Sequence, residues 1–433
     1  MGAHQGVTNL TLLPAARLRG TIDVPGDKSI SHRAVLLAAL ADGVSRVTHL
    51  APGADQRSMT ASLRALGVGI DADGGGVVIQ GGGLLGLTTP VGLELDCGNS
   101  GATLRFLTGV LCAIPGTRAQ LSGDESLRAR PMERVATPLR RMGAEVETTA
   151  GRPPLTVAGR PLAGITHDLE VASAQVKTAI LLAGLNADGV TSVVERIPTR
   201  DHTERLLSRL GVAIDRGEMI RMAPPGRLPG FELAVPGDPS AAAFWVVLAA
   251  IHPDAELVLR GVCINPTRSG YLAVLARMGA EIQVGHGRDE AGEPVADITV
   301  QSSRLRGTEV SAEEVPSLVD EVPVLAVAAA AAEGTTIFRG LAELRVKESD
   351  RVDAIRDQLG AMGARVDVDG DDIAVSGREF LDGSDVDAGG DHRVAMMLAV
   401  AATVARGVTR IRGAESAGVS YPGFYDQLAA LGK

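Results

Sequence analysis

Basic and small polar side chains gather at the starts of six apolar stretches of this sequence. The six starts read GDKSISHR, CGNSGATLR, ASAQVK, PGDPSA, VDEVP and GGDHR. If each stretch is a helix, its first amides lack partners and its N-terminus carries a partial positive charge, so each start can bind an anion. Lys28, Arg33, Arg105, Lys177 and Arg393 add full positive charges at these starts. The pattern indicates a site for a small ligand with several negative charges.

More basic side chains lie in loops that precede a second set of helical patterns. They are Arg128, Arg130, Arg134, Arg200, Arg345, Lys347 and Arg351. Each of them could instead be a solvated cation that pairs with a nearby Asp or Glu. Recurrence of the basic groups at one position of six stretches favours the ligand site, and we expect the six helix ends to converge on one cleft.

The composition limits the class of protein that carries such a site. The chain has 433 residues, a formal net charge of −10, 45% hydrophobic residues and 22% charged residues, which are ordinary proportions for a soluble globular protein. With 3 cysteines, a disulfide framework or a thiolate metal cage is excluded. With 2% aromatic residues and no Lys/Arg run, we expect no nucleic acid partner.

Neither an export signal nor a membrane span is expected. The first twenty residues lack a basic segment followed by an apolar one. The longest apolar runs, such as residues 322–332, reach about a dozen residues, whereas a spanning helix needs about 20. We therefore expect a cytoplasmic protein with no membrane partner.

The elements that hold these groups repeat six times. Amphipathic helical patterns end on a Leu-Gly or Met-Gly pair, and the glycines are 68 to 84 residues apart. The pairs are Leu66-Gly67, Met142-Gly143, Leu210-Gly211, Met278-Gly279, Met362-Gly363 and Leu431-Gly432. Glycine suits the position after a helix, and alternating stretches such as residues 144–148 predict strands. The repeat is therefore strand, buried helix, strand, surface helix, strand.

The six more apolar stretches predict the buried helices, because they are hydrophobic on all sides. They begin near Ser31, Ala102, Gln175, Ser240, Pro323 and His392. The last surface helix needs strand partners from the N-terminus, so we expect residues 1–22 and 238–433 to form one lobe of three repeats. Residues 23–237 then form the other lobe. The sequence VPGD occurs at both crossovers, so we expect hinges near residues 20–27 and 236–238.

Eight motifs in order resemble those of the 5-enolpyruvylshikimate-3-phosphate synthase family, the 3-phosphoshikimate 1-carboxyvinyltransferases. They read GDKSISHRA, DCGNSGATLR, GDESLRARPMERV, SAQVKTAILLAG, TRDHTE, DEVPVLAVAAAAAEG, LRVKESDR and GDHRVAMM. The resemblance implies an α/β fold of two lobes, each an inverse α/β barrel of three repeats. It also implies transfer of the enolpyruvyl group of phosphoenolpyruvate to the 5-hydroxyl of shikimate 3-phosphate, with release of phosphate in the shikimate pathway. No metal or cofactor is implied, and we expect a monomer.

The resemblance also implies the ligand contacts. Those for shikimate 3-phosphate are Lys28, Ser29, Arg33, Ser173, Gln175, Thr199, Arg200, Asp320 and Lys347. Those for phosphoenolpyruvate are Lys28, Asn99, Gly101, Arg130, Gln175, Arg351 and Arg393, with Arg105 as a further candidate. The family's inhibitor glyphosate competes for the second set, and tolerant members resemble this chain with alanine in place of Gly101.

Three residues are candidates for the proton transfers that this reaction needs. Glu348 is the candidate acid, although it could instead belong to an exposed ladder with Lys347 and Arg351. Asp320 is the candidate base, because a lone carboxylate in an apolar stretch is costly without a partner or a role. Lys28 is a competing base or a proton relay. His392 is either a site residue or a histidine that only begins its helix.

Three departures from the family pattern affect phosphate binding. Ala174 stands where one branch has serine, Val419 where some members have lysine, and Glu343 where asparagine is common. Two alternatives remain open from the sequence. The related UDP-N-acetylglucosamine enolpyruvyl transferases carry a reactive cysteine in the loop that reads GDESLRARP here, and no cysteine lies between Cys112 and Cys263. A non-catalytic phosphosugar-binding protein would lack the acids and bases.

Overall fold

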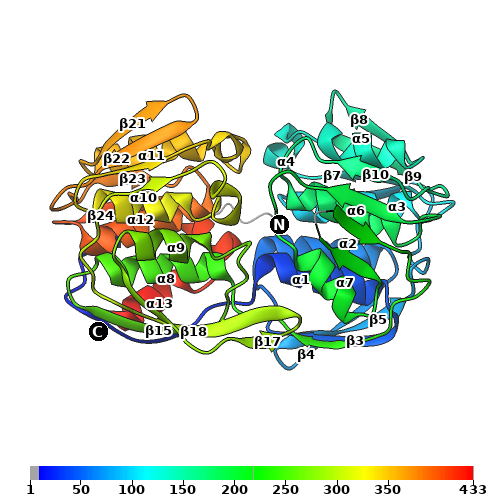
Figure 1. The fold of residues 1–433 in the computed structure, drawn as a ribbon, viewed down its shortest axis with the longest axis horizontal. Helices are drawn as coiled ribbons and strands as arrows, with labels where there is room; N and C mark the ends of the chain where they lie inside the picture. Colours follow the sequence, from blue (N-terminus) through cyan, green and yellow to red (C-terminus); the bar gives the residue numbers. More distant parts are fainter. Residues whose placement is uncertain (1–8, 218, 433) are drawn as a thin grey trace. The chain divides into compact units, whose positions relative to one another are not determined.

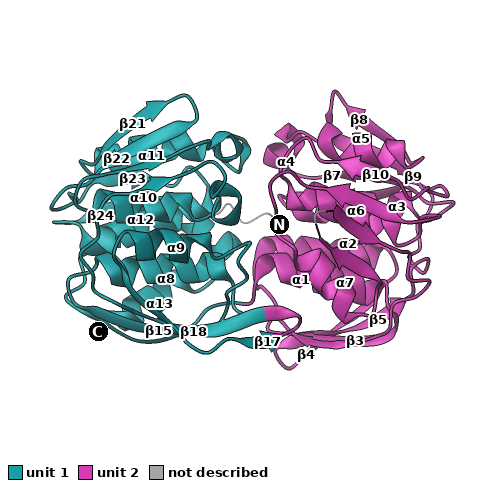
Figure 2. Ribbon diagram, viewed as in Figure 1, with its two compact units in different colours: residues 1–25, 236–289, 294–433 teal, residues 26–235, 290–293 magenta. Residues whose placement is uncertain are grey.

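The computed structural model describes residues 9–217 and 219–432. Two compact units divide this part of the chain (Figure 2). Of the described residues, unit 1 contains 9–25, 236–289 and 294–432, and unit 2 contains 26–217, 219–235 and 290–293. The divisions at 25/26 and 235/236 lie close to the boundaries at 22/23 and 237/238 that the sequence predicts. The return of residues 290–293 to unit 2 was not expected.

Unit 2 contains three four-stranded sheets, each with one parallel pair at its edge. The first has the order β14 (Glu232–Ala234), β3 (Asp42–Thr48), β5 (Gly76–Gly82), β4 (Gly69–Asp73). The second has the order β6 (Leu93–Asp96), β7 (Arg118–Ser122), β9 (Arg152–Ala158), β8 (Glu145–Thr149). The third has the order β10 (Thr166–Asp168), β11 (Thr191–Val194), β13 (Met219–Met222), β12 (Ile214–Arg216).

Unit 1 also contains three sheets with one parallel pair each. The first has the order β16 (Glu281–Val284), β18 (Glu293–Gln301), β15 (Ala255–Cys263), β2 (Leu18–Asp23), and β17 (Arg288–Glu290) pairs with β18. The second has the order β19 (Glu309–Val310), β20 (Thr335–Phe338), β22 (Asp372–Ser376), β21 (Arg365–Asp369). The third has the order β1 (Asn9–Leu12), β24 (Thr409–Arg412), β23 (Asp385–Asp387). Six small mixed sheets with helices confirm the predicted fold class.

At each of the two crossovers, the strand that precedes one unit pairs in a sheet of the other unit. Strand β2 precedes the first repeat of unit 2 but pairs in parallel with β15 of unit 1, and Leu18 faces Ala255. Strand β14 precedes the first repeat of unit 1 but pairs in parallel with β3 of unit 2. The first sheet of each unit is therefore completed by the segment that leads into the other unit.

Six helices form the interior of the two units, three in each (Figure 1). In unit 2 they are α1 (Lys28–Ala39), α3 (Gly101–Cys112) and α6 (Ala174–Gly184). In unit 1 they are α8 (Pro239–Ile251), α10 (Val322–Ala330) and α12 (His392–Val404). All residues of α10 and all but the last residue of α8 are buried. The structure confirms the six predicted buried helices.

A second helix in each repeat carries the Leu-Gly or Met-Gly ending. These helices are α2 (Ala54–Ala65), α5 (Glu133–Arg141), α7 (His202–Arg209), α9 (Gly270–Arg277), α11 (Arg351–Ala361) and α13 (Phe424–Leu431). The glycine after each of the first five has φ between 83° and 103°, a left-handed conformation that favours glycine. Gly432 differs, because its φ is −87° and it caps α13 directly.

The core of unit 1 contains the chain's single tryptophan. Trp245 on α8 is fully buried, and its ring centroid lies 4.8 Å from that of Phe424 on α13. Its indole nitrogen donates to the Tyr421 hydroxyl over 3.1 Å. Tryptophan fluorescence therefore reports on the folding of unit 1. Among the described residues, no helix is long and apolar enough to cross a membrane.

Candidate active site

The starts of the three buried helices meet within each unit. In unit 2, His32 in the first turns of α1 lies 3.4 Å from Ser100, which caps α3, and Arg105 of α3 hydrogen-bonds to Gln175 of α6. The corresponding starts in unit 1 are joined by Glu321, which caps α10. Its carboxylate accepts a hydrogen bond from Ser240 of α8 and lies 3.8 Å from Arg393 of α12. Within each unit the three helix starts therefore lie close together, and the convergence of all six on one cleft stays a prediction.

The helix caps differ between the units in a way that affects anion binding. In unit 2, α3 and α6 are capped by the neutral hydroxyls of Ser100 and Ser173, whereas α1 is capped by the carboxylate of Asp27. In unit 1, the carboxylates of Asp238 and Asp391 cap α8 and α12, and Glu321 precedes α10 with its carboxylate on Ser240 and near Arg393. A carboxylate at a helix start already occupies its positive end, whereas a hydroxyl leaves that charge for a ligand. The ends of α3 and α6 are thus the better anion sites.

Two arginines lie beside the first residue of α3. A Cβ at Gly101 would come within 2.9 Å of an Arg105 nitrogen and 3.3 Å of an Arg130 nitrogen. Arg130 donates to the Asn99 side-chain oxygen over 2.6 Å, and Asn99 donates to Asp124 over 2.7 Å. Asp124 in turn caps α4 (Glu125–Ala129) by accepting from Leu127 N. These contacts place both guanidinium groups at a helix start that has no acidic cap.

The start of α1 carries the predicted residues Lys28, Ser29 and Arg33. Lys28 is partly exposed and its ammonium lies 2.9 Å from the Asp55 carboxylate of α2. Arg33 is buried and donates to the Ser29 carbonyl, to Thr178 of α6 and to Thr203 of α7. Arg33 therefore ties α1 to two other helices in addition to any contact with a ligand.

The loop before α7 carries Thr199 and Arg200 and is anchored by a buried cation. Lys177 lies 2.9 Å from Glu195 and 2.7 Å from Glu204, and it donates to the Thr199 carbonyl over 3.4 Å. Burial raises the pKa of Glu204, although the charge of Lys177 opposes this change. The Lys177 side chain is 1% exposed and its ammonium is held by these two carboxylates and the Thr199 carbonyl, so its charge fixes this loop, and a role as a ligand cation stays a prediction.

Arg351 is the centre of the site residues in unit 1. Its guanidinium contacts Asp391 at 2.8 Å, Glu348 at 2.6 Å and Asp320 at 3.4 Å. Burial disfavours its charged form, but the three carboxylates outweigh this effect and raise its pKa. Arg351 is 1% exposed, so the exposed ladder that the sequence allowed for Glu348 and Arg351 is wrong.

Asp320 lies between two arginines and is not the lone carboxylate that the sequence suggested. Its carboxylate is 3.4 Å from Arg351 and 3.6 Å from Arg393, which also donates to the Asp320 carbonyl. The Lys347 ammonium lies 3.4 Å from Glu343. Desolvation lowers the pKa of Lys347, and the charges of Asp320 and Glu343 partly offset this effect. His392, the first residue of α12, is buried.

The other predicted cations serve the fold or remain at the surface. Arg345 pairs with Asp350 at 2.9 Å and with Asp371 at 3.1 Å, so it links α11 to the hairpin of β21 and β22. Arg128 is exposed on α4. The predicted site residues thus fall into two groups, one on each unit, and each group gathers around helix starts and arginines.

Sequence reasoning missed the carboxylates that hold these cations, above all Asp391. Asp391 is fully buried and accepts from Arg351, from Ser349 and from the Arg393 amide. Burial alone would raise the pKa of Asp391, but the charge of Arg351 holds it below the usual value. An Asp before an apolar helix that begins with a cation, as in GGDHR, is the signal that could have found it.

We expect Asp391→Asn to destabilise unit 1 by about 3 to 5 kcal/mol, because it removes one partner of a buried ion pair. Since the folded pKa of Asp391 lies below its unfolded value of about 3.9, its stabilisation is present above that pH. The stabilisation is lost as the pH falls through the folded pKa. Urea unfolding followed by Trp245 fluorescence at pH 7 and pH 3 measures both effects. The exposed Asp385→Asn is the control, and equal stability of the two variants would contradict the expectation.

Comparisons with known proteins agree with this arrangement. The family model of EPSP synthase (3-phosphoshikimate 1-carboxyvinyltransferase) matches residues 13–428. The 3-phosphoshikimate 1-carboxyvinyltransferase of Gloeobacter violaceus is 51% identical over 97% of this chain and 98% of its own. That of Roseiflexus sp. strain RS-1 is 49% identical over the same shares.

Solved structures have the same fold. An EPSP synthase from Acinetobacter baumannii is 42% identical, covers 98% of both chains and has a TM-score of 0.87. The enolpyruvyl transferase NikO from Streptomyces tendae, 21% identical with a TM-score of 0.79, shares the fold over 99% of this chain and 98% of its own. These matches favour the first sequence interpretation over its two alternatives. The chain therefore belongs to the EPSP synthase (3-phosphoshikimate 1-carboxyvinyltransferase) family and has the EPSP synthase activity of the shikimate pathway.

Proposed function

We propose that the two groups of site residues are the two halves of one active site, which transfers the enolpyruvyl group of phosphoenolpyruvate to the 5-hydroxyl of shikimate 3-phosphate. The observation that supports this most directly is the distribution of charge. Unit 2 offers helix starts with neutral caps beside Arg105 and Arg130, and unit 1 offers Arg351 and Arg393 beside Asp320. Two anionic substrates need such cations, and the reaction needs acids and bases among them.

Shikimate 3-phosphate suits the start of α6 and the loop before α7. Ser173, Gln175, Thr199 and Arg200 supply hydroxyl, amide and guanidinium donors for its phosphate, with Lys28 and Ser29 from the start of α1 and the charge of Arg33 behind them. The hydroxyls of its ring then require the carboxylate of Asp320 and the ammonium of Lys347. Arg200 provides the charge-assisted hydrogen bonds that a phosphate favours.

Phosphoenolpyruvate brings a carboxylate and a phosphate, for which bidentate guanidinium groups are suited. Arg130, Arg351 and Arg393 are the arginines we assign to it, with Lys28 and Gln175 as shared contacts. Asn99 orients Arg130 by accepting its hydrogen bond. Gly101 has no side chain, so the backbone at the start of α3 can approach the ligand closely.

The reaction proceeds by addition and elimination through a tetrahedral intermediate. The oxygen of the 5-hydroxyl attacks C2 of phosphoenolpyruvate and its proton passes to Asp320, while Glu348 delivers a proton to the vinyl CH2. In the second half, the Glu348 carboxylate takes a proton back from the new methyl group, the double bond reforms, the bond from C2 to the phosphate oxygen breaks, and phosphate departs with the proton that Asp320 had accepted. The Asp320 carboxylate lies 3.4 Å from Arg351 and 3.6 Å from Arg393, so the candidate base stands beside two of the cations that we assign to phosphoenolpyruvate. Lys28 is an alternative base or a relay.

We expect Asp320→Asn to lower turnover by about 10²-fold or more, the usual scale for a general acid or base, while the protein still folds and loses less in substrate affinity and stability than in turnover, because Asp320 also faces the ring hydroxyls and pairs with Arg351 and Arg393. Phosphate release from mixed substrates measures turnover, and a thermal melt measures folding. The exposed Asp385→Asn is the matched control. A large fall in melting temperature with normal turnover would show a structural role instead, and so refute the assignment of Asp320 as the base.

We expect the chain to be sensitive to glyphosate and Gly101→Ala to weaken glyphosate binding more than phosphoenolpyruvate binding. Glyphosate is longer, and the new methyl group would meet the nitrogens of Arg105 and Arg130 and take up space at this helix start. The ends of these flexible side chains can shift, so we also expect some loss of phosphoenolpyruvate affinity. The measurement is the ratio of the glyphosate inhibition constant to the KM for phosphoenolpyruvate. A ratio that does not rise would disprove this steric account.

The two units are lobes that close on shikimate 3-phosphate, since this ligand uses groups of both units and the chain crosses between them at residues 25/26 and 235/236. We expect small-angle scattering to give a smaller radius of gyration with shikimate 3-phosphate than with phosphoenolpyruvate alone. Equal radii for the two ligands would contradict this order of closure. A concentration series in the same experiment tests whether the protein is a monomer. Its cytoplasmic location stays a prediction.

A further inference from the structure

A four-residue hairpin tip, residues 290–293, belongs to unit 2 although the chain on both sides of it belongs to unit 1. It joins β17 to β18 through Ala291 and Gly292, whose φ angles are 60° and 80°. Two successive left-handed residues match the tight turn that suits a two-residue hairpin. Two residues further on, Val295 pairs with Cys263 of β15. The hairpin tip is therefore held by a regular sheet directly behind it.

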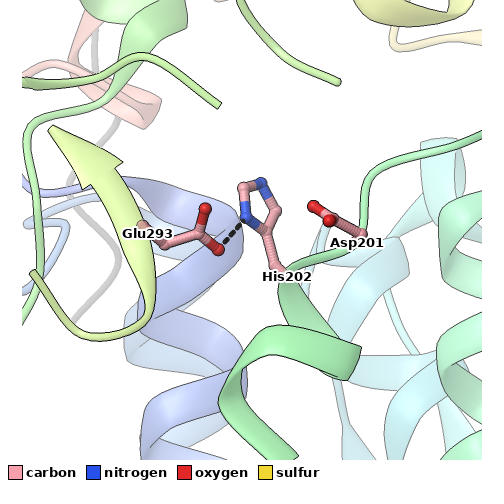
Figure 3. A group of neighbouring side chains, drawn as sticks. All are labelled: Asp201, His202 and Glu293. Atoms are coloured by element: carbon pink, nitrogen blue, oxygen red, sulfur yellow. Dashed lines mark hydrogen bonds and ion pairs between the residues drawn. The ribbon is translucent and has the colours of Figure 1, made fainter. Parts of the chain in front are cut away.

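The hairpin tip places a buried carboxylate against the start of α7. Glu293 is fully buried and its Oε1 lies 2.7 Å from Nδ1 of His202 (Figure 3). Its Oε2 lies 3.6 Å from Nε of Arg205, and Arg205 also donates to the Gly292 carbonyl over 3.1 Å. Two side chains of the first turn of α7 thus contact the hairpin tip.

Asp201, His202 and Glu293 are close enough together to hold a metal ion, but the guanidinium group of Arg205 already lies beside both carboxylates. The Arg205 guanidinium is 2.8 Å from Asp201 and 3.6 Å from Glu293. A metal ion would have to compete with this positive charge for both carboxylates. The arrangement is better explained as a structural contact that fixes the start of α7.

The residues directly before His202 are those that the proposed function assigns to the phosphate of shikimate 3-phosphate. Thr199 and Arg200 precede Asp201, and the other end of this short loop is held by Lys177 through Glu195 and the Thr199 carbonyl. The loop is thus fixed at one end from α6 and at the other from the hairpin tip. Only the second anchor comes from a chain segment whose neighbours belong to unit 1.

We propose that Glu293 is a positioning residue for phosphate recognition: through His202 and Arg205, the hairpin tip holds the loop 199–201 so that Arg200 can bind the substrate's phosphate. This inference rests on the assignment of Thr199 and Arg200 under the proposed function. Glu293 contacts no substrate itself. Its effect is therefore specific to the phosphate of the ligand, whereas a general loss of stability would affect all ligands alike.

Binding of two ligands that differ only in the phosphate tests this role. In Glu293→Ala we expect the Kd for shikimate 3-phosphate to rise about fivefold or more, while the Kd for shikimate changes less than twofold. We expect kcat at saturating substrates to stay within about twofold. Asp297→Ala is the matched control, since Asp297 is an exposed carboxylate on the same strand. Its carboxylate accepts from the Gly261 amide and lies 3.6 Å from Arg288, and both of these residues belong to unit 1. It should leave both dissociation constants unchanged.

A second variant and a second measurement guard against misfolding. Glu293→Gln keeps an oxygen that can accept from His202 but loses the charge that faces Arg205, so we expect a rise of about twofold to fivefold for shikimate 3-phosphate. Amide hydrogen exchange in residues 195–202 should be faster in both variants and unchanged in Asp297→Ala. Equal losses for shikimate and shikimate 3-phosphate, or unchanged exchange in this loop, would overturn the proposal.

Arg200→Ala separates the positioning role from the assignment on which it rests. We expect it to abolish most of the preference for shikimate 3-phosphate over shikimate. An unchanged preference in Arg200→Ala would refute the phosphate assignment itself. A preference that is lost in Arg200→Ala but kept in Glu293→Ala would refute the role of the hairpin tip alone.

Discussion

The arrangement of the site depends on one constraint, the parallel pair of strands in each of the six sheets. A parallel pair needs a long connection, and a buried helix supplies it in four of the six sheets, whereas β2 and β14 complete the other two parallel pairs across the crossovers. Because the pairs repeat, the three buried helices of a unit begin beside one another, as the contacts of Ser100 with His32 and of Glu321 with Ser240 show. Their positive ends are thereby gathered together, and such a gathering favours anions.

The two units resolve this accumulation of positive charge differently. In unit 1, the carboxylates of Asp238 and Asp391 cap two helix starts and Glu321 lies at the third, and these acids hold arginines in return. Unit 2 leaves two of its ends capped by serine. A buried guanidinium such as that of Arg351 is rigid because several carboxylates fix it. Ligand binding therefore costs less side-chain conformational entropy at this arginine than at an exposed one.

At each crossover, the chain enters one unit from a strand that belongs to the other. Strands β2 and β14 each complete the sheet that lies on the other side of a crossover, and residues 290–293 add a contact of the same kind at the start of α7. The strand that leads into one unit is thus hydrogen-bonded along its length within a sheet of the other unit. Such a crossover has a fixed end on each side, which restricts the positions at which the backbone can bend.

The sequence by itself determined the repeat, the six buried helices and the residues that gather at their starts, because hydrophobic periodicity and glycine endings are local signals. Its motifs also led to the predictions for Arg130, Arg351 and Asp320. Only the tertiary structure decided which charges face each other. Lys177 sits among Glu195 and Glu204, Asp320 lies between two arginines, and Glu293 reaches His202 across 91 positions of the chain. Local patterns do not encode such pairs, since burial and long-range packing bring the partners together.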